Sequence, residues 1–223
     1  KPLTFSYRIR EIFKIKTLSP ILFSLILLLK FQNATAQTNI DSTFLKVPMS
    51  ELPLLEHNPR LDMIDLYNYK MIAKGENIFG GTSVLTKKTQ NSLSIDLTDS
   101  SHWELIQVPQ KTDTIYICLH TTKTPAEETT IRFYNKNWDT DSVISPPTFS
   151  LDDFWHNNDS IPIEQQNILK KKLSPLYVKA CCENTETPTP RLTFSVSITL
   201  LDSESQKNVS KCLKPKYWIY PMK

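Results

Sequence analysis

The hydrophobic pattern of the chain changes its period at a window from Gly75 to Gly81 that holds all three of its glycines. Before this window, apolar side chains recur every three to four residues between Leu61 and Ile72. This spacing predicts an amphipathic helix over about residues 59–73. Asn58 can cap the N-terminus of this helix, and Pro59 suits its first position.

The glycines themselves predict a corner between this helix and a sheet. Gly75 falls where a C-terminal capping glycine belongs. Gly80 and Gly81 would turn the chain into a first strand near Thr82, with Ile78–Phe79 fixing the corner to the core. A phosphate-binding loop follows a strand and precedes a helix, so the order here argues against one.

After Gly81 the apolar positions alternate with a period of two. Four such runs, separated by short polar turns, predict an antiparallel meander with one covered face, and the helix is its natural cover. The apolar positions of the runs are Leu93, Ile95 and Leu97; Trp103 and Leu105; Ile115, Ile117 and Leu119; and Ile131 and Phe133.

The second half of the chain predicts a smaller unit of the same kind. Two strands are expected at Leu176–Cys182 and Leu192–Leu200, a helix at Ser203–Leu213 and a closing strand at Tyr217–Tyr220. The fold class is therefore α+β: a mainly antiparallel sheet covered by an N-terminal helix, with a smaller C-terminal strand-strand-helix-strand part.

The first 36 residues differ from the rest of the chain. Basic Lys14 and Lys16, an apolar run from Leu18 to Leu29, and the small residues of Ala34-Thr35-Ala36 are the three parts of a secretory signal peptide. The run is shorter than the about 20 residues of a membrane span. We expect residues 1–36 to be cleaved, which leaves no stable membrane span; an uncleaved N-terminal anchor is the alternative.

This signal predicts a periplasmic or extracellular protein that begins at Gln37. Residues 37–48 would form a polar linker, and residues 49–223 a single α+β domain with possible subdomains at 49–138 and 150–223. Of the 26 basic and 23 acidic residues, six and one lie in the leader, so the remainder carries a net charge of about −2. This balance gives no reason to expect a nucleic-acid partner.

The four cysteines permit disulfides in an exported chain. One of the adjacent Cys181 and Cys182 could bridge to Cys118 or Cys212, three full pairings are possible, and buried free thiols are the alternative. The cysteines lack paired C-x-x-C spacing and have no histidine near them in sequence. Neither a metal site nor a cofactor is therefore predicted.

The sequence indicates a binding surface more clearly than a catalytic site. Tyr116 and Tyr134 fall on the polar face of the predicted sheet, where large amphipathic side chains suit recognition; a second layer formed by the C-terminal half could instead cover them. His102 and His120 could share a face on neighbouring strands. These four residues are the candidate surface, and no residue is predicted to be catalytic.

Five segments together suggest a family. They are Arg60–Tyr67, Phe79–Gly81, Leu93–Leu97, Ile117–His120 and Ile131–Trp138. In this order and spacing, from about residue 44 to the C-terminus, the chain resembles the secreted Bacteroidales family of unknown function DUF3256. The resemblance implies an exported envelope protein of Gram-negative anaerobes, and it brings no catalytic motif.

The function predicted from the sequence is therefore that of an exported, non-enzymatic protein. It would bind a protein, peptide or glycan in the periplasm or at the cell envelope. The alternatives are a cryptic hydrolase whose residues converge from different strands, and a structural subunit of an envelope assembly.

Overall fold

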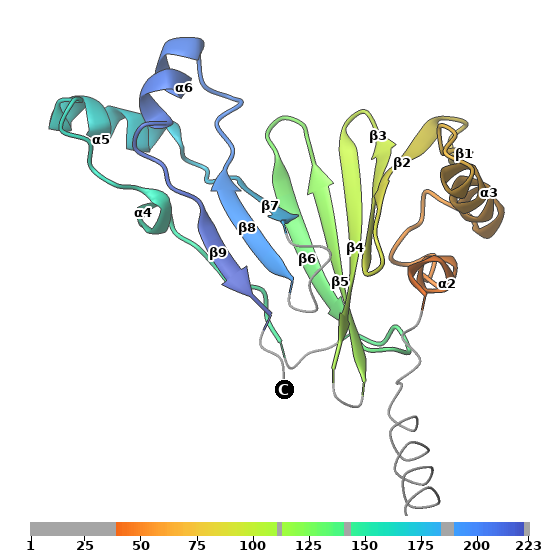
Figure 1. Cartoon of the computed structure of the whole chain (residues 1–223). Helices are drawn as coiled ribbons and strands as arrows, with labels where there is room; N and C mark the ends of the chain where they lie inside the picture. The colour runs from red at the N-terminus through yellow and green to blue at the C-terminus, as the bar shows by residue number, and fades with distance from the viewer. Residues whose placement is uncertain (1–38, 111–112, 141–143, 184–189, 221–223) are drawn as a thin grey trace, which may run out of the picture. The chain divides into compact units, whose positions relative to one another are not determined.

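The computed structural model describes residues 39–110, 113–140, 144–183 and 190–220 (Figure 1). Its strands form two antiparallel sheets, which confirms the predicted α+β class. The larger sheet contains, in chain order, β1 (Lys74–Glu76), β2 (Thr82–Lys88), β3 (Ser92–Thr98), β4 (Ser101–Pro109), β5 (Thr114–Thr122) and β6 (Glu128–Tyr134). The smaller contains β7 (Val178–Cys182), β8 (Arg191–Val196) and β9 (Lys216–Ile219).

Five helices accompany these strands in the described part of the chain. They are α2 (Ile40–Leu45), α3 (His57–Asn68), α4 (Leu151–Phe154), α5 (Ile163–Lys172) and α6 (Ser203–Val209). Within the described residues, no helix has both the length and the apolar character needed to cross a bilayer.

One face of the larger sheet is covered by α2, α3 and the loop between them. Phe44, Leu55 and Met63 come from these elements, and they share a core with Ile95 and Trp103 of the sheet. All five side chains are completely buried. The predicted cover by an N-terminal helix is therefore confirmed, and α2 and the loop extend it. The prediction of one covered face was wrong, because only the predicted apolar positions of β3 and β4 face the helices, whereas those of β5 and β6 face the smaller sheet.

The opposite face is covered only in part, by the smaller sheet. Ile117 and Phe133 of the larger sheet share a second core with Leu192 and Phe194 of β8. The free edge of β7 rests on the larger sheet, where the Thr129 hydroxyl accepts the Ala180 N–H at 2.9 Å. This cover leaves several positions on β2, β3 and the start of β4 that point away from the helices half-buried. We call this region the open face: Val84, Ser94, Asp96, Thr98, His102 and Glu104.

The predicted helix is real, but its ends were misplaced. It begins at His57 after Glu56, rather than after Asn58, and it stops at Asn68. The Met71 N–H donates to the Leu66 carbonyl, and Lys70 adopts a left-handed φ of 59°. This is a Schellman motif with lysine in the position that glycine usually takes. The helix therefore ends before the apolar positions at helical spacing do.

The glycine window therefore has a different role from the one predicted. Gly75 lies in β1, where a Cβ would come within 2.7 Å of the Met63 sulfur, so glycine allows β1 to approach α3. Gly80 has a φ of 74° and turns the chain between β1 and β2, as expected of one of the paired glycines. Ile78 and Phe79 do not fix this corner to the core, because they are 51% and 82% exposed.

The expected polar linker is also largely structured. Ile40–Leu45 form α2, and the Asn39 side chain caps it by accepting the Asp41 N–H at 3.0 Å. Phe44 is completely buried. The helix was not predicted because polar side chains separate the few apolar residues of this segment in the sequence. The predicted signal peptide, residues 1–36, lies outside the described residues.

Candidate functional site

The two tyrosines of the predicted surface lie inside the protein. Tyr116 is 4% exposed and Tyr134 is 9% exposed. Both rings pack against Trp138, at centroid distances of 4.7 and 5.5 Å. They point toward the α2 and α3 side of the sheet, where the helices and their loop cover them, so their assignment to an exposed surface was wrong.

The two histidines do not share a face. His120 on β5 lies opposite Trp103 on β4, whereas His102 lies opposite Thr121. Because neighbouring positions along a strand point to opposite faces, the one-residue offset separates the two imidazoles. Burial lowers the pKa of His120, and Arg132 lowers it further against the opposing effect of Glu51.

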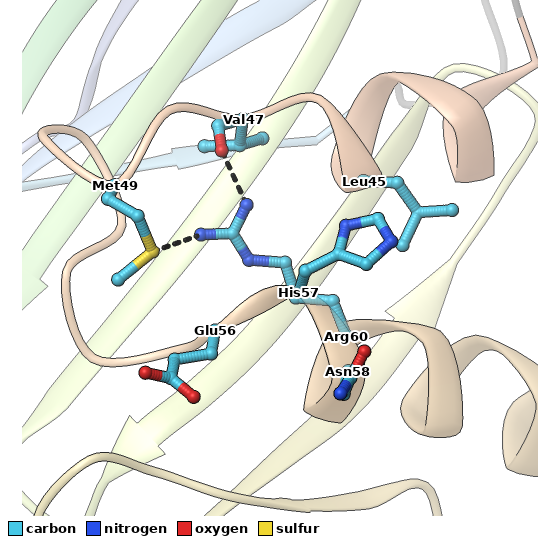
Figure 2. Close-up of a pocket in the computed structure, with 7 residues that line it drawn as sticks. All are labelled: Leu45, Val47, Met49, Glu56, His57, Asn58 and Arg60. Carbon is cyan, nitrogen blue, oxygen red and sulfur yellow. Dashed lines mark hydrogen bonds between the residues drawn. The ribbon is translucent and has the colours of Figure 1, made fainter.

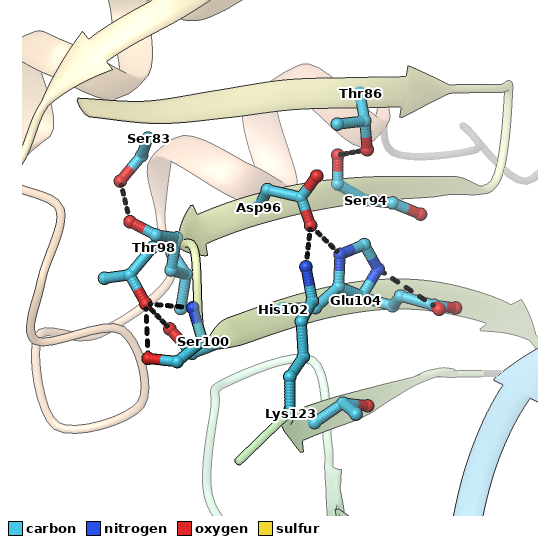
Figure 3. A network of polar contacts seen from close by, with 12 residues as sticks. Ser83, Thr86, Ser94, Asp96, Thr98, Ser100, His102, Glu104 and Lys123 are labelled. Atoms are coloured by element: carbon cyan, nitrogen blue, oxygen red, sulfur yellow. Dashed lines mark hydrogen bonds and ion pairs between the residues drawn. The ribbon is translucent and has the colours of Figure 1, made fainter. Parts of the chain in front are cut away.

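His102 stands at the centre of a charged cluster on the open face (Figure 3). Its Nδ1 lies 2.8 Å from Asp96 Oδ1, and its Nε2 lies 3.4 Å from Glu104 Oε1. Lys123 at the end of β5 donates to the same Asp96 oxygen at 3.0 Å. The imidazole is therefore held between two carboxylates from β3 and β4.

The electrostatics of the cluster favour the charged forms. Burial alone would lower the pKa of His102, but its contacts with Glu104 and Asp96 outweigh this effect and raise it. Burial alone would raise the pKa of Asp96, but His102 and Lys123 lower it. The contacts within the cluster therefore favour the protonated form of His102 and the ionised form of Asp96.

This geometry does not suit acid–base or nucleophilic catalysis. A general base needs a nitrogen free to reach the substrate proton, and both nitrogens of His102 already face carboxylates. The half-buried Cys181 is a poor nucleophile, since burial and Glu104 raise its pKa. Asp96 and Glu104 approach opposite sides of the imidazole, and the described residues contain no cluster of histidine, cysteine or acidic side chains that could hold a metal ion.

A hollow of about 400 Å³ lies on the other side of the molecule, beside α3 (Figure 2). It is lined by Leu45, Val47, Met49, Glu56, His57, Asn58 and Arg60. The Arg60 guanidinium is 2% exposed and donates to the carbonyls of Val47, Leu52 and Leu55. Burial lowers its pKa. Arg60 thus ties the loop to α3, and its donors are occupied by three main-chain carbonyls and the Met49 sulfur.

Glu51 connects the same loop to the sheet. It is 3% exposed; one carboxylate oxygen accepts the Trp103 indole N–H at 3.1 Å, and the other accepts from Arg132 at 3.0 Å and the Tyr134 hydroxyl at 2.6 Å. No role for Glu51 or Arg60 was predicted from the sequence. The available signal was a charged residue within or beside the apolar run Met49–Leu55.

All four cysteines are free thiols. Cys118 lies in the core beneath the helices, Cys182 packs against the core between the sheets, and Cys212 lies in a third core beside α5 and α6. Cys181 and Cys182 point to opposite faces of β7, as neighbours on a strand do. The sequence left a bridge and buried free thiols open as alternatives; the structure shows free thiols, of which Cys118 and Cys212 are buried and Cys181 and Cys182 half-buried.

Two antiparallel sheets, with helices over one face of the larger, define an α+β protein whose charged cluster lies on an open sheet face. The model of the family described as "Protein of unknown function (DUF3256)" matches residues 31–221, and the chain belongs to this family.

A solved structure supports the same fold. The "Structure of a domain of an uncharacterized protein from Porphyromonas gingivalis W83" aligns with a TM-score of 0.61 and 19% sequence identity. The alignment covers 81% of this chain and 92% of that one, and at this identity it shows the fold alone. A search among curated proteins found no match.

Proposed function

We propose that this chain is an exported, non-enzymatic binding module that holds a protein partner of the cell envelope against the open face. The observation that supports this most directly is the asymmetry of β3. Leu93, Ile95 and Leu97 are completely or almost completely buried, whereas Ser94, Asp96 and Thr98 between them are half-exposed. A solvent-accessible sheet face whose charged side chains are already held in place can recognise a complementary charged surface of a partner protein.

The chemistry of the open face favours a protein over a glycan. Sugar rings are usually held against aromatic faces, and none of the six open-face residues is Trp, Tyr or Phe. Hydroxyl groups and paired charges instead match the polar main chain and charged side chains of a protein surface. Hydrolysis, the competing function, is disfavoured because His102 has no free nitrogen.

Two features of the sequence support export to the envelope. The basic flank, the apolar run and the small residues that end at Ala36 have the form of a signal peptide. The resemblance to a secreted Bacteroidales family points the same way. N-terminal sequencing of the protein from its native cells should then begin at Gln37, and a retained apolar run would contradict export by cleavage.

A photo-crosslinking experiment tests the open face directly. A photoreactive amino acid is placed at Ser94 on the open face, or at the exposed Ser210 after α6 as a matched control. Irradiation in the native cells should give one discrete protein adduct from position 94 and none from position 210. The proposal fails if position 94 gives no protein adduct. It also fails if positions 94 and 210 give the same adducts. Turnover in a hydrolase screen that is lost in His102→Gln would favour the enzyme instead.

A further inference from the structure

Strand β1 is an edge of the larger sheet, and part of its main chain faces outward. The Leu85 N–H donates to the Ala73 carbonyl at 2.9 Å, and the Asn77 N–H donates to the Gly81 carbonyl at 2.8 Å. In an antiparallel ladder such residues alternate with residues whose main chain points away from the neighbouring strand. Lys74 and Glu76 are therefore the outward-pointing residues of β1.

Some of these outward groups are already used by nearby segments. The Lys74 N–H donates to the Ile72 carbonyl, and the Ile78 N–H donates to the Leu54 carbonyl. The Lys74 carbonyl and both main-chain groups of Glu76 have no such partner among the described residues. Both side chains are exposed, and neither forms an ion pair within the described part of the chain. Edge groups of this kind are templates for another strand.

We infer that β1 pairs with β1 of a second copy of this chain, in an antiparallel, two-fold symmetric contact centred on Gly75. In this register Lys74 of each copy lies opposite Glu76 of the other, so the short sequence Lys-Gly-Glu is complementary to itself. Each Glu76 N–H faces the Lys74 carbonyl across the contact. Such a self-complementary patch is what an isologous dimer requires.

Gly75 favours the same register. It would lie opposite Gly75 of the second copy in a pair without mutual hydrogen bonds, which is the closer of the two antiparallel spacings, at about 4.5 Å between Cα atoms. A side chain at this position would already meet Met63 within its own copy. The absence of a side chain on both copies leaves the centre of the contact unobstructed.

Exposed apolar side chains flank the charged pairs. Ile72 is 71% exposed and Ile78 is 51% exposed, and they lie two residues before Lys74 and two residues after Glu76. Met71 and Phe79, at 60% and 82% exposed, lie next to them in sequence. Four large apolar side chains exposed within nine residues are unusual on a monomer surface and typical of a contact region.

This inference goes beyond the proposed function and does not depend on it. The two-fold axis of an antiparallel strand pair is perpendicular to the sheet, so both open faces would point to the same side of one continuous sheet. The two charged clusters would then form a single larger surface. Self-association through β1 can hold or fail whether or not the open face binds a partner.

Reciprocal charge reversal tests the contact. Sedimentation of the purified protein over about 10 μM to 1 mM should show a reversible monomer–dimer equilibrium, because so short a contact gives a weak dimer. Lys74→Glu or Glu76→Lys each place like charges at both symmetry-related pairs, and either should weaken association by about tenfold or more. The double variant restores opposite charges and should recover most of the wild-type association. Lys171→Glu, on exposed α5, is the matched control and should have no effect.

Several results would overturn the inference. These are a wild-type protein that stays monomeric at 1 mM, single variants that associate as strongly as wild type, and a double variant that associates no better than the singles. Circular dichroism shows whether each variant is folded, and recovery in the double variant cannot come from misfolding. Crosslinking from Ser94 to a partner protein reports separately on the open face.

Discussion

The buried Glu51 offers the sharpest test of what holds the loop against the sheet. Its carboxylate accepts hydrogen bonds from Trp103, Arg132 and Tyr134, and its side chain is 1% exposed. Replacing it with alanine removes the acceptor for two donors that water cannot easily reach. Trp103 is completely buried and Tyr134 is 9% exposed, whereas the Arg132 side chain is 52% exposed and can be hydrated.

The magnitude follows from these exposures. A buried donor left without a partner costs about 1–3 kcal/mol, so Glu51→Ala should lower the free energy of unfolding by about 3–5 kcal/mol. Glu51→Gln keeps the shape and one acceptor and should cost about 1–3 kcal/mol. Arg132→Ala removes a half-exposed partner but leaves the buried carboxylate without the cation that it contacts, so it should cost about 1–2 kcal/mol, less than Glu51→Ala.

Urea denaturation followed by tryptophan fluorescence measures all three variants, and Trp103 itself reports on the site. For a domain of this size, each kcal/mol corresponds to about 2–4 °C in Tm, so Glu51→Ala should melt roughly 10 °C below wild type. Equal stability of Glu51→Ala and Arg132→Ala, or a cost below about 1 kcal/mol for both, would show that the buried acceptor does not hold the loop against the sheet.

Three further predictions concern other parts of the fold. Gly75→Ala should lower the free energy of unfolding by about 1–3 kcal/mol, because its Cβ would overlap the Met63 sulfur. Gly80→Ala should lower it by about 1–2 kcal/mol, because the φ of this residue is left-handed. Urea denaturation that finds either variant as stable as wild type would contradict this geometry. Arg60→Met should lower the free energy of unfolding by about 3 kcal/mol, since the variant leaves three buried carbonyls without a donor; a neutral effect in the same assay would mean that water replaces the guanidinium. His102 has a folded pKa above its ordinary 6.5, so its stabilising contribution is complete below that pH and is lost as the pH rises through the folded pKa. His120 has a lowered pKa, so its contribution is present above 6.5 and is lost on acidification. Thermal melts between about pH 5 and pH 9 should therefore show that His102→Gln is most costly at low pH and His120→Gln at high pH, and parallel pH profiles would contradict the assignment.

The sequence predicted the larger sheet well because its signal is local. Alternation at Leu93, Ile95 and Leu97 identifies both the strand and its buried face, and the four predicted strands all appear in the structure. The helix was predicted for the same reason, since its apolar positions recur at helical spacing. Its C-terminus was missed because Lys70 takes the left-handed position by itself, without the glycine that usually marks it.

The candidate surface was predicted less well because it depends on contacts between distant segments. Alternation correctly places Tyr116 and Tyr134 on one face, but it cannot show that the loop around Glu51 covers that face. The pairing of His102 with Asp96 depends on the register between β3 and β4, and a one-residue shift would place the two side chains on opposite faces. A period of two therefore identifies faces, and tertiary contacts decide which face remains open.

The most direct test of the central proposal uses the protein crosslinked from position 94. Calorimetry measures its affinity for three proteins: wild type, Asp96→Arg on the open face, and the matched control Glu204→Arg on α6. Asp96→Arg reverses one charge of the cluster and should lower the affinity at least about tenfold, whereas Glu204→Arg should leave it unchanged. Equal binding by all three proteins would show that the open face is not the binding surface.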